Sequence, residues 1–244
     1  MLFRSVVVVL LAATVSARAY AQDEAPKYLH SVVSALGWSN EAIKAFDRAE
    51  RIKGPGGKIE ILYANKTAND NYRKARAEIE PYTESSMKMI VESAKGLVAA
   101  FDAYSKICFD WDALQHDLAT AEGDVRTGKI DNPEAALAGF QERTAELKFR
   151  SDKIGELLGT AVSGASWAAY QADDGGMPRY PLLYAVSPDE RARLVKELTA
   201  TFGKSVAAGP ETGQSYLEIS AAMLCKVLTQ GETKATKKGR ARKK

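Results

Sequence analysis

Asp112, His116 and Asp117 come nearest to a metal-binding arrangement in this sequence. Asp112 and His116 lie four residues apart, so in a helix they share one face, and Asp117 is adjacent. Di-iron bundles, however, take a Glu-x-x-His motif from each of two helices together with two further glutamates. His30, the only other histidine, has no carboxylate at that spacing. The sequence therefore favours a solvated Asp–His pair and predicts neither a metal site nor a cofactor.

Two further motifs match catalytic or nucleotide-binding signatures only in part. Segment 164–168 (GASWA) has a serine between small residues, but a nucleophile elbow needs a strand–turn–helix setting and this segment is predicted to lie within a helix. Lys58 follows a glycine cluster, but Ile52 and Ile59 occupy positions where a phosphate-binding loop needs glycine and Ser or Thr. No catalytic residue is predicted, and the sequence favours a non-enzymatic protein over an enzyme with unidentified carboxylates.

The two cysteines are candidates for a disulfide bond. Cys108 lies on an apolar helix seam, and Cys225 lies beside the apolar face of the last helix. In an oxidising compartment such thiols tend to pair, so we predict a Cys108–Cys225 disulfide; two buried free thiols are the alternative. The bridge requires the last helix to pack across the middle of the helix that carries Cys108.

Residues 171–186 form the only long loop expected inside the folded body. Long ordered loops in compact domains are often functional, so this one, with the end of the preceding helix, is a candidate small-ligand pocket. The alternative is a loop that only covers the end of the bundle. The candidate pocket residues are Trp167, Tyr170, Asp173, Asp174, Arg179, Tyr180 and Tyr184.

Residues 1–21 are typical of a secretory signal peptide. A short basic start and an apolar run are followed by Ala19-Tyr20-Ala21, an A-x-A cleavage site, with Ala17-Arg18-Ala19 as the competing site. The alternative, an uncleaved membrane anchor, needs about 20 apolar residues, and Arg18 interrupts the run too early. The mature chain is expected to be soluble, not integral to the membrane, and periplasmic or secreted, in a Gram-negative bacterium.

Charge is divided unevenly along the chain. Residues 231–244 hold seven basic residues and one acidic residue, a net charge of +6. The whole chain carries +3 and the signal +2, so the body at 22–230 carries −5. A segment of this composition cannot bury apolar surface, so we predict a disordered basic tail that contacts anionic surfaces. Its basic residues are Lys234, Lys237, Lys238, Arg240, Arg242, Lys243 and Lys244.

The body reads as helix throughout, because alternating strand patterns and Asn-Gly hairpins are absent from it. Helical segments are predicted over about 26–53, 58–80, 82–121 and 133–171, and a last helix carries an apolar face of Leu217, Ala221, Leu224 and Leu228. Capping signals predict helix starts at Pro133 and Pro188, and a weaker one at Gly209-Pro210-Glu211. Pro81 either kinks the second helix or starts a third.

The two longest segments carry heptad patterns. A strict 3,4 spacing keeps one seam facing a partner helix, and the short connection makes the two helices antiparallel neighbours. Each helix is roughly 55 Å long at 1.5 Å per residue, so the prediction is an all-α, elongated antiparallel helical bundle of five or six helices. Recurrent small residues at Gly155, Gly159 and Ser163 favour close helix packing. The seams run through Met87, Ile90, Ala94, Leu97, Phe101, Tyr104, Cys108, Trp111, Gln115 and Leu118, and through Leu137, Phe140, Thr144, Leu147, Ser151, Ile154, Leu158, Ala161, Ala165 and Ala168.

Two classes of function follow from these features. The first is an exported interaction protein whose basic tail contacts anionic envelope components, with a protein partner on its helix faces as a further option. The second is a small-ligand-binding or sensing bundle with a site near the 171–186 loop. Lys and Arg bind any phosphate, but the export signal argues against nucleic acid as a specific partner.

Overall fold

The computed structural model describes the backbone of residues 2–51, 57–168 and 186–241, and the side chains of 24–48, 60–164 and 186–229. The described residues form α-helices and short 3-10 helices, with no strand among them, which confirms the predicted all-α class. The α-helices are α1 (Leu2–Arg51), α2 (Gly57–Ile79), α3 (Lys88–Arg126), α4 (Pro133–Ala168), α5 (Pro188–Phe202) and α6 (Tyr216–Ala241). The 3-10 helices are η1 (Glu80–Glu84) and η3 (Lys204–Ala207).

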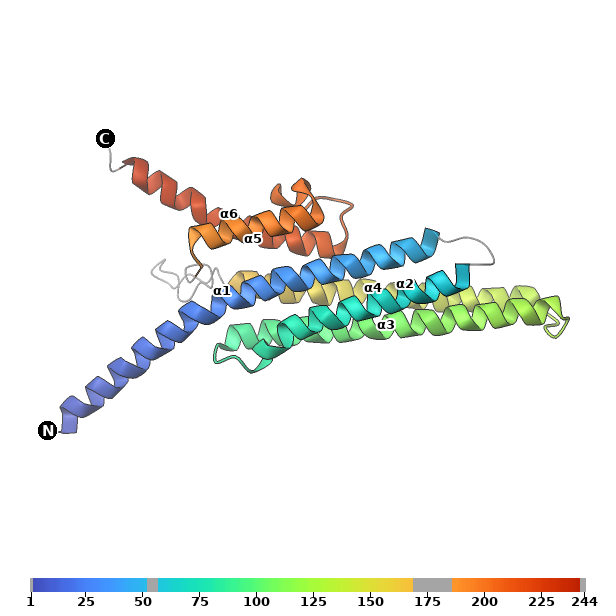
Figure 1. The fold of residues 1–244 in the computed structure, drawn as a ribbon, viewed down its shortest axis with the longest axis horizontal. Coiled ribbons are helices and arrows are strands. Elements are labelled where there is room, and N and C mark those ends of the chain that lie inside the picture. The colour runs from blue at the N-terminus through green and yellow to red at the C-terminus, as the bar shows by residue number, and fades with distance from the viewer. Residues whose placement is uncertain (1, 52–56, 169–185, 242–244) are drawn as a thin grey trace.

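The helices pair as three antiparallel hairpins, α1–α2, α3–α4 and α5–α6, laid along one long axis (Figure 1). Each helix also packs on a helix of another hairpin: α2 on α3, α4 on α6, and α1 on α5. The neighbours therefore close a ring in the order α1, α2, α3, α4, α6, α5. The ring is complete only over part of the length, because α5 and α6 are shorter than α3 and α4.

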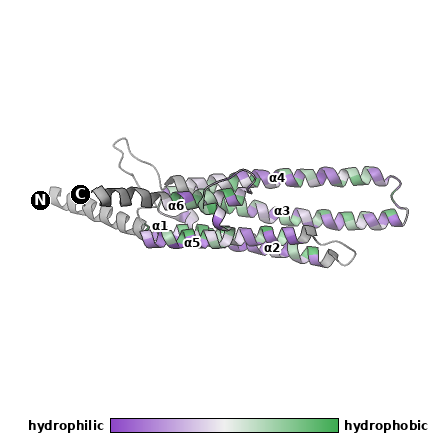
Figure 2. Cartoon of the chain, turned by 90° about the horizontal axis from the view of Figure 1, so that it is seen from above, coloured by the Kyte–Doolittle hydropathy of each residue, from purple (hydrophilic) through white to green (hydrophobic). Residues whose placement is uncertain are grey.

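The hydrophobic core fills this ring. Its largest fully buried side chains include Tyr28 and Leu36 of α1, Phe101 of α3 and Leu198 of α5. On the α3 seam, the side chains from Ile90 to Phe101 that the 3,4 spacing selects are all buried. Farther along, Leu118 and Leu137 are 36% and 54% exposed, because α3 and α4 are the only described helices that reach that end of the molecule (Figure 2).

Local capping chemistry sets two helix starts as predicted. The Ser187 hydroxyl accepts a hydrogen bond from the Glu190 amide at the start of α5, and Asn132 accepts one from the Ala135 amide at the start of α4. Pro81 neither kinks a helix nor starts an α-helix, since it lies in the 3-10 helix η1 between α2 and α3.

The weak start signal at Gly209-Pro210-Glu211 is wrong, because α6 begins at Tyr216. Ser215 and Glu218 form a reciprocal capping box there: the Ser215 amide donates to the Glu218 carboxylate at 2.8 Å, and the Glu218 amide donates to the Ser215 hydroxyl at 3.3 Å. This box fixes where α6 begins. It therefore also fixes how far along α1 and α4 the α5–α6 hairpin covers the bundle.

The predicted Cys108–Cys225 disulfide is absent, since both cysteines are free and buried. The bridge required the last helix to cross the middle of α3. Instead, α6 packs mainly on α4, α5 and η3, and α3 is not among its main neighbours. Both thiols lie in the hydrophobic core without a bond between them.

The small residues of α4 serve close packing, as predicted. A Cβ atom added at Gly155 would lie 2.6 Å from Cδ2 of Tyr216, and one at Gly159 would lie 3.7 Å from the Ser220 hydroxyl oxygen. Both neighbours belong to α6. Gly155 and Gly159 therefore let α6 approach the α4 backbone.

The predictions for the two ends of the chain are not tested by the described side chains. The cleavage point after Ala21 falls inside α1, and α6 continues into the basic segment, but the side chains of 1–23 and 230–244 lie outside the described ones. The signal peptide and the disordered tail therefore stay predictions. Within the described part of the chain, no helix is long and apolar enough to cross a membrane.

Candidate functional site

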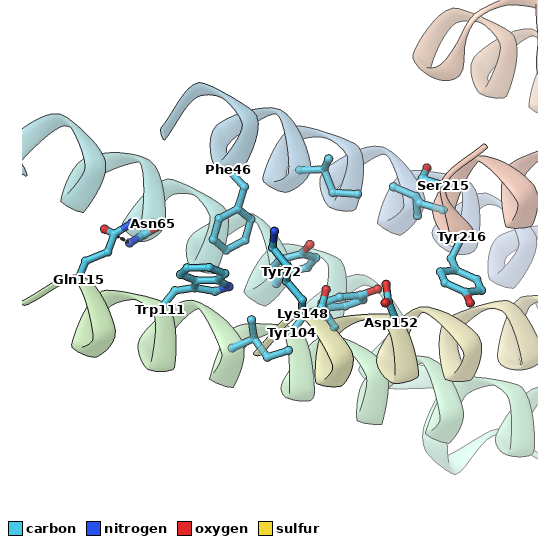
Figure 3. Close-up of a pocket in the computed structure, with 14 residues that line it drawn as sticks. Phe46, Asn65, Tyr72, Tyr104, Trp111, Gln115, Lys148, Asp152, Ser215 and Tyr216 are labelled. Atoms are coloured by element: carbon cyan, nitrogen blue, oxygen red, sulfur yellow. Dashed lines mark hydrogen bonds between the residues drawn. The ribbon is translucent and has the colours of Figure 1, made fainter. Parts of the chain in front are cut away.

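A groove of about 450 Å³ opens between α1 and α4 in the middle of the molecule (Figure 3). It exists because α6 begins only at Tyr216, so nothing of the α5–α6 hairpin covers the gap between α1 and α4 beyond that residue. This volume falls in the range of ligand pockets in proteins. The lining residues are Ile43, Phe46, Asn65, Tyr72, Tyr104, Ile107, Trp111, Gln115, Lys148, Ser151, Asp152, Ser215, Tyr216 and Leu217.

Aromatic rings from several helices dominate the groove. Tyr72 of α2 and Tyr104 of α3 stack with ring centroids 4.9 Å apart and planes 9° apart. Trp111, two turns farther along α3, and Phe46 of α1 extend this surface (Figure 3). Phe46, Tyr104 and Trp111 are half-buried, so part of each ring stays open to an occupant. Such a surface suits a flat apolar body.

The α4 wall of the groove is charged. Lys148 and Asp152 lie one helical turn apart, both exposed and both lining the groove. In Figure 3, Lys148 reaches from α4 toward Phe46 and Tyr72, while Asp152 lies between Tyr104 and Tyr216. Burial raises the pKa of the Tyr104 hydroxyl to about 12, and the nearby Asp152 carboxylate contributes to that rise. The wall thus presents one cation and one anion beside an aromatic surface.

The two ends of the groove are neutral. At one end the Asn65 amide donates to the Gln115 side-chain oxygen at 3.3 Å, from α2 to α3. At the other end stand Ser215 and Tyr216, at the capped start of α6. The amide pair keeps unused donor and acceptor capacity, because each primary amide has two donors and an acceptor oxygen.

A second, more open groove of about 410 Å³ lies near the far end of the α3–α4 hairpin. This end, which we call the arm (residues 118–140), extends past α1 and α2 (Figure 2). Its groove is lined by apolar residues of both helices, among them Leu118, Val125, Leu137 and Phe140. Val125 is 40% exposed, so this end of the seam stays partly open to solvent.

The structure places the predicted site residues as follows. The predicted pocket lies outside the described residues: Trp167 is on α4 with its side chain undescribed, and Tyr170, Asp173, Asp174, Arg179, Tyr180 and Tyr184 fall in 169–185. The tail lysines and arginines likewise have undescribed side chains. Asp117 does not join His116 in a metal site, since its carboxylate pairs with Arg143 at 2.9 Å. Among the described residues, no group of three or more His, Cys, Asp or Glu could hold a metal ion.

Sequence reasoning missed the groove, although part of its signal was present. Tyr104, Trp111 and Gln115 belong to the α3 seam by their 3,4 spacing, and apolar aliphatic residues are usual at such positions. Of the four seam positions from Tyr104 to Gln115, only Cys108 is fully buried; the other three are aromatic with a polar atom, or an amide, and mark a stretch that is partly open. That anomaly could have located the groove along α3, though not its α1 and α4 walls.

The raised pKa values of the two buried thiols and of Tyr104 make the free energy of unfolding depend on pH in the alkaline range. Burial raises the pKa of Cys108 from 9.0 to about 12 and that of Cys225 from 9.0 to about 11. Below pH 9 both thiols are protonated in the folded and the unfolded chain, so their contribution to stability is complete. Above pH 9 the unfolded chain loses these protons first, so the free energy of unfolding should fall steadily toward pH 11–12.

Urea unfolding at pH 7.5, 9.0 and 10.5 measures this effect. Labelling of both cysteines in urea without reductant verifies that they are free thiols and can titrate. A Cys108→Ala, Cys225→Ala variant should lose less stability over the same interval. An equal loss in the variant would show that the thiols do not control the alkaline limb.

Comparison of the chain with protein-family models, with curated proteins and with solved structures found no match. The assignment of function therefore rests on the chain's own residues and geometry.

Proposed function

We propose that the chain is an exported, non-enzymatic helical-bundle interaction protein whose basic tail contacts anionic envelope components. The observation that carries this proposal is the path of α6. Its last described core residue is Leu228, yet the helix continues to Ala241, and Figure 1 shows its end projecting from the bundle. This path supports a tail that reaches outward: the +6 segment at 231–244 begins on the projecting part of α6, and the body carries −5.

The compartment follows from the first 21 residues. Their basic start, apolar run and A-x-A site support export to the periplasm or beyond, with cleavage after Ala21. In a Gram-negative envelope, the abundant anions are lipid headgroups, phosphates of lipopolysaccharide and acidic polymers. Each basic residue near such a surface contributes about 1 kcal/mol of attraction, which falls off within a Debye length.

The arm supports a protein partner for the same molecule. Leu118, Val125 and Leu137 expose apolar surface on two helices that have no third helix beside them within the described part of the chain. Burial of such surface contributes roughly 25 cal/mol per Å², so a partner helix laid along the arm would gain stability. Tail and arm would then hold an envelope surface and a protein at opposite ends of one elongated bundle.

Salt dependence tests the electrostatic part of the proposal. Mature protein mixed with vesicles that contain anionic lipid should co-sediment at low ionic strength and dissociate as NaCl approaches 0.5 M, because screening shortens the Debye length. Vesicles of neutral lipid alone provide the control and should bind little protein. Salt-independent binding would show that apolar contacts, and not the tail, hold the protein to the vesicle.

A second candidate function is small-ligand binding, and the mid-bundle groove favours it. The groove combines an aromatic floor with charged and amide groups at defined positions, which is the usual composition of a ligand site. It replaces the predicted site at the 171–186 loop as the better supported location for a ligand. The two functions are compatible, because the groove and the tail use different parts of the bundle.

A further inference from the structure

Lys148 stands apart from the other basic residues of its stretch of α4. Arg143 pairs with Asp117 at 2.9 Å, Arg150 with Asp110 at 2.7 Å, and Lys153 with Glu156 at 2.9 Å. Lys148 has no ion pair with any described residue, although Asp152 lies one turn away on the same face. Asp152 likewise forms no ion pair or hydrogen bond within the described part of the chain. Among the described residues, this wall of the groove therefore presents one cation and one anion without an ion-pair partner, and the Asp152 carboxylate also lies in the field of Lys153.

The separation of these charges limits what can satisfy both. Residues four apart on a helix have Cβ atoms about 5–6 Å apart. A dipeptide in extended form spans at most about 7 Å between its termini, at 3.3–3.6 Å per residue. Its carboxylate and ammonium can therefore reach Lys148 and Asp152 together, and each contact would be a charge-assisted hydrogen bond.

The rest of the groove selects the side chains of such a ligand. Beside the charged wall lie the stacked pair Tyr72–Tyr104 and the half-buried rings of Phe46 and Trp111. Along α3, Tyr104 and Gln115 are separated by about 16 Å at 1.5 Å per residue, so the aromatic floor extends beyond the charged wall. The groove volume of about 450 Å³ exceeds the needs of a single small amino acid and suits a ligand with two rings.

On the basis of the second candidate function, we propose that this groove binds zwitterionic aromatic ligands of dipeptide size. The ligand carboxylate meets Lys148, its ammonium meets Asp152 between Tyr104 and Tyr216, and its rings lie on the aromatic floor. An ammonium placed there would also gain attraction from the faces of the neighbouring tyrosine rings. The Asn65–Gln115 amide pair is left to contact a polar group at the distal end of the ligand.

Isothermal titration calorimetry with phenylalanyl-phenylalanine and its capped forms tests the proposal. The free dipeptide should bind, and N-acetylation or C-terminal amidation should each weaken its binding about tenfold, since each removes one charged contact. Lys148→Gln should weaken binding of the free dipeptide but not of the amidated one, which has already lost the carboxylate. Asp152→Asn should show the same pattern with the acetylated form.

Trp111→Leu tests whether the ligand binds in the groove, independently of whether the ligand must be a zwitterion. Trp38→Leu is its matched control. Trp38 lies outside the groove, where Lys74 sits 4.5 Å from its ring centroid. If the free and the doubly capped dipeptide bound equally well, and Trp111→Leu alone abolished that binding, the zwitterion proposal would be overturned. Small-ligand binding in the groove would remain supported. Absence of binding by every probe, with the wild-type helical circular dichroism signal intact, would overturn both.

Discussion

Gly155→Leu should separate α6 from α4 and lower the free energy of unfolding by roughly 3 kcal/mol, the upper part of the range for overpacking a tight contact. At Gly155 even a Cβ atom would lie 2.6 and 2.8 Å from two ring carbons of Tyr216, and 3.0 Å from its Cβ. The ring could rotate, but the Tyr216 Cβ is fixed to the α6 backbone. A leucine therefore displaces the helix and not only a side chain.

Gly139→Leu is the matched control, because it makes the same change on the same helix with no atom within 4 Å of the added Cβ. It should keep or raise stability, since leucine has a higher helix propensity than glycine. Urea unfolding measures both variants. Truncation of the clashing ring in Gly155→Leu, Tyr216→Ala should restore part of the loss. Equal stability of Gly155→Leu and Gly139→Leu would contradict the close α4–α6 contact.

Phe101→Ala should lower the free energy of unfolding by about 3–5 kcal/mol, the usual cost of removing a buried aromatic ring and leaving a cavity. Phe101 is 0% exposed and lies in the core where α3 faces the interior of the ring of helices. In urea unfolding, an unchanged slope of free energy against urea concentration would show that the variant is less stable and that its unfolded state is equally expanded.

Phe109→Ala provides an internal control on the same helix. Its side chain is 62% exposed, so the same deletion removes little buried surface and should change stability by less than about 0.5 kcal/mol. Comparable losses at the two positions would mean that the α3 faces are assigned the wrong way round.

The sequence predicted those features of the fold that are encoded locally. The starts of α4 at Pro133 and α5 at Pro188 follow from capping residues within four positions. The burial of Ile90, Leu97 and Phe101 follows from heptad spacing along one helix. These signals need no knowledge of what the helix packs against.

Features that depend on how the hairpins assemble were predicted poorly. The disulfide failed because an apolar face on the last helix does not say which helix it will cover, and α6 packs on α4 instead of α3. The groove could not be predicted because it depends on the start of α6, which is set by the Ser215–Glu218 box and not by Pro210. Lys148 and Asp152 look like ordinary surface charges until α1 is placed opposite them.

The central claim, that this is an interaction protein held to anionic envelope surfaces by its tail, is tested most directly by one comparison. Chains 22–244 and 22–230 are sedimented with the same anionic vesicles at low salt. The deletion should leave thermal stability nearly unchanged, because exposed charges contribute little to folding. It should also abolish vesicle binding, because it removes all seven basic residues of the tail. Equal binding by the two chains would contradict the claim and assign the interaction to the bundle itself.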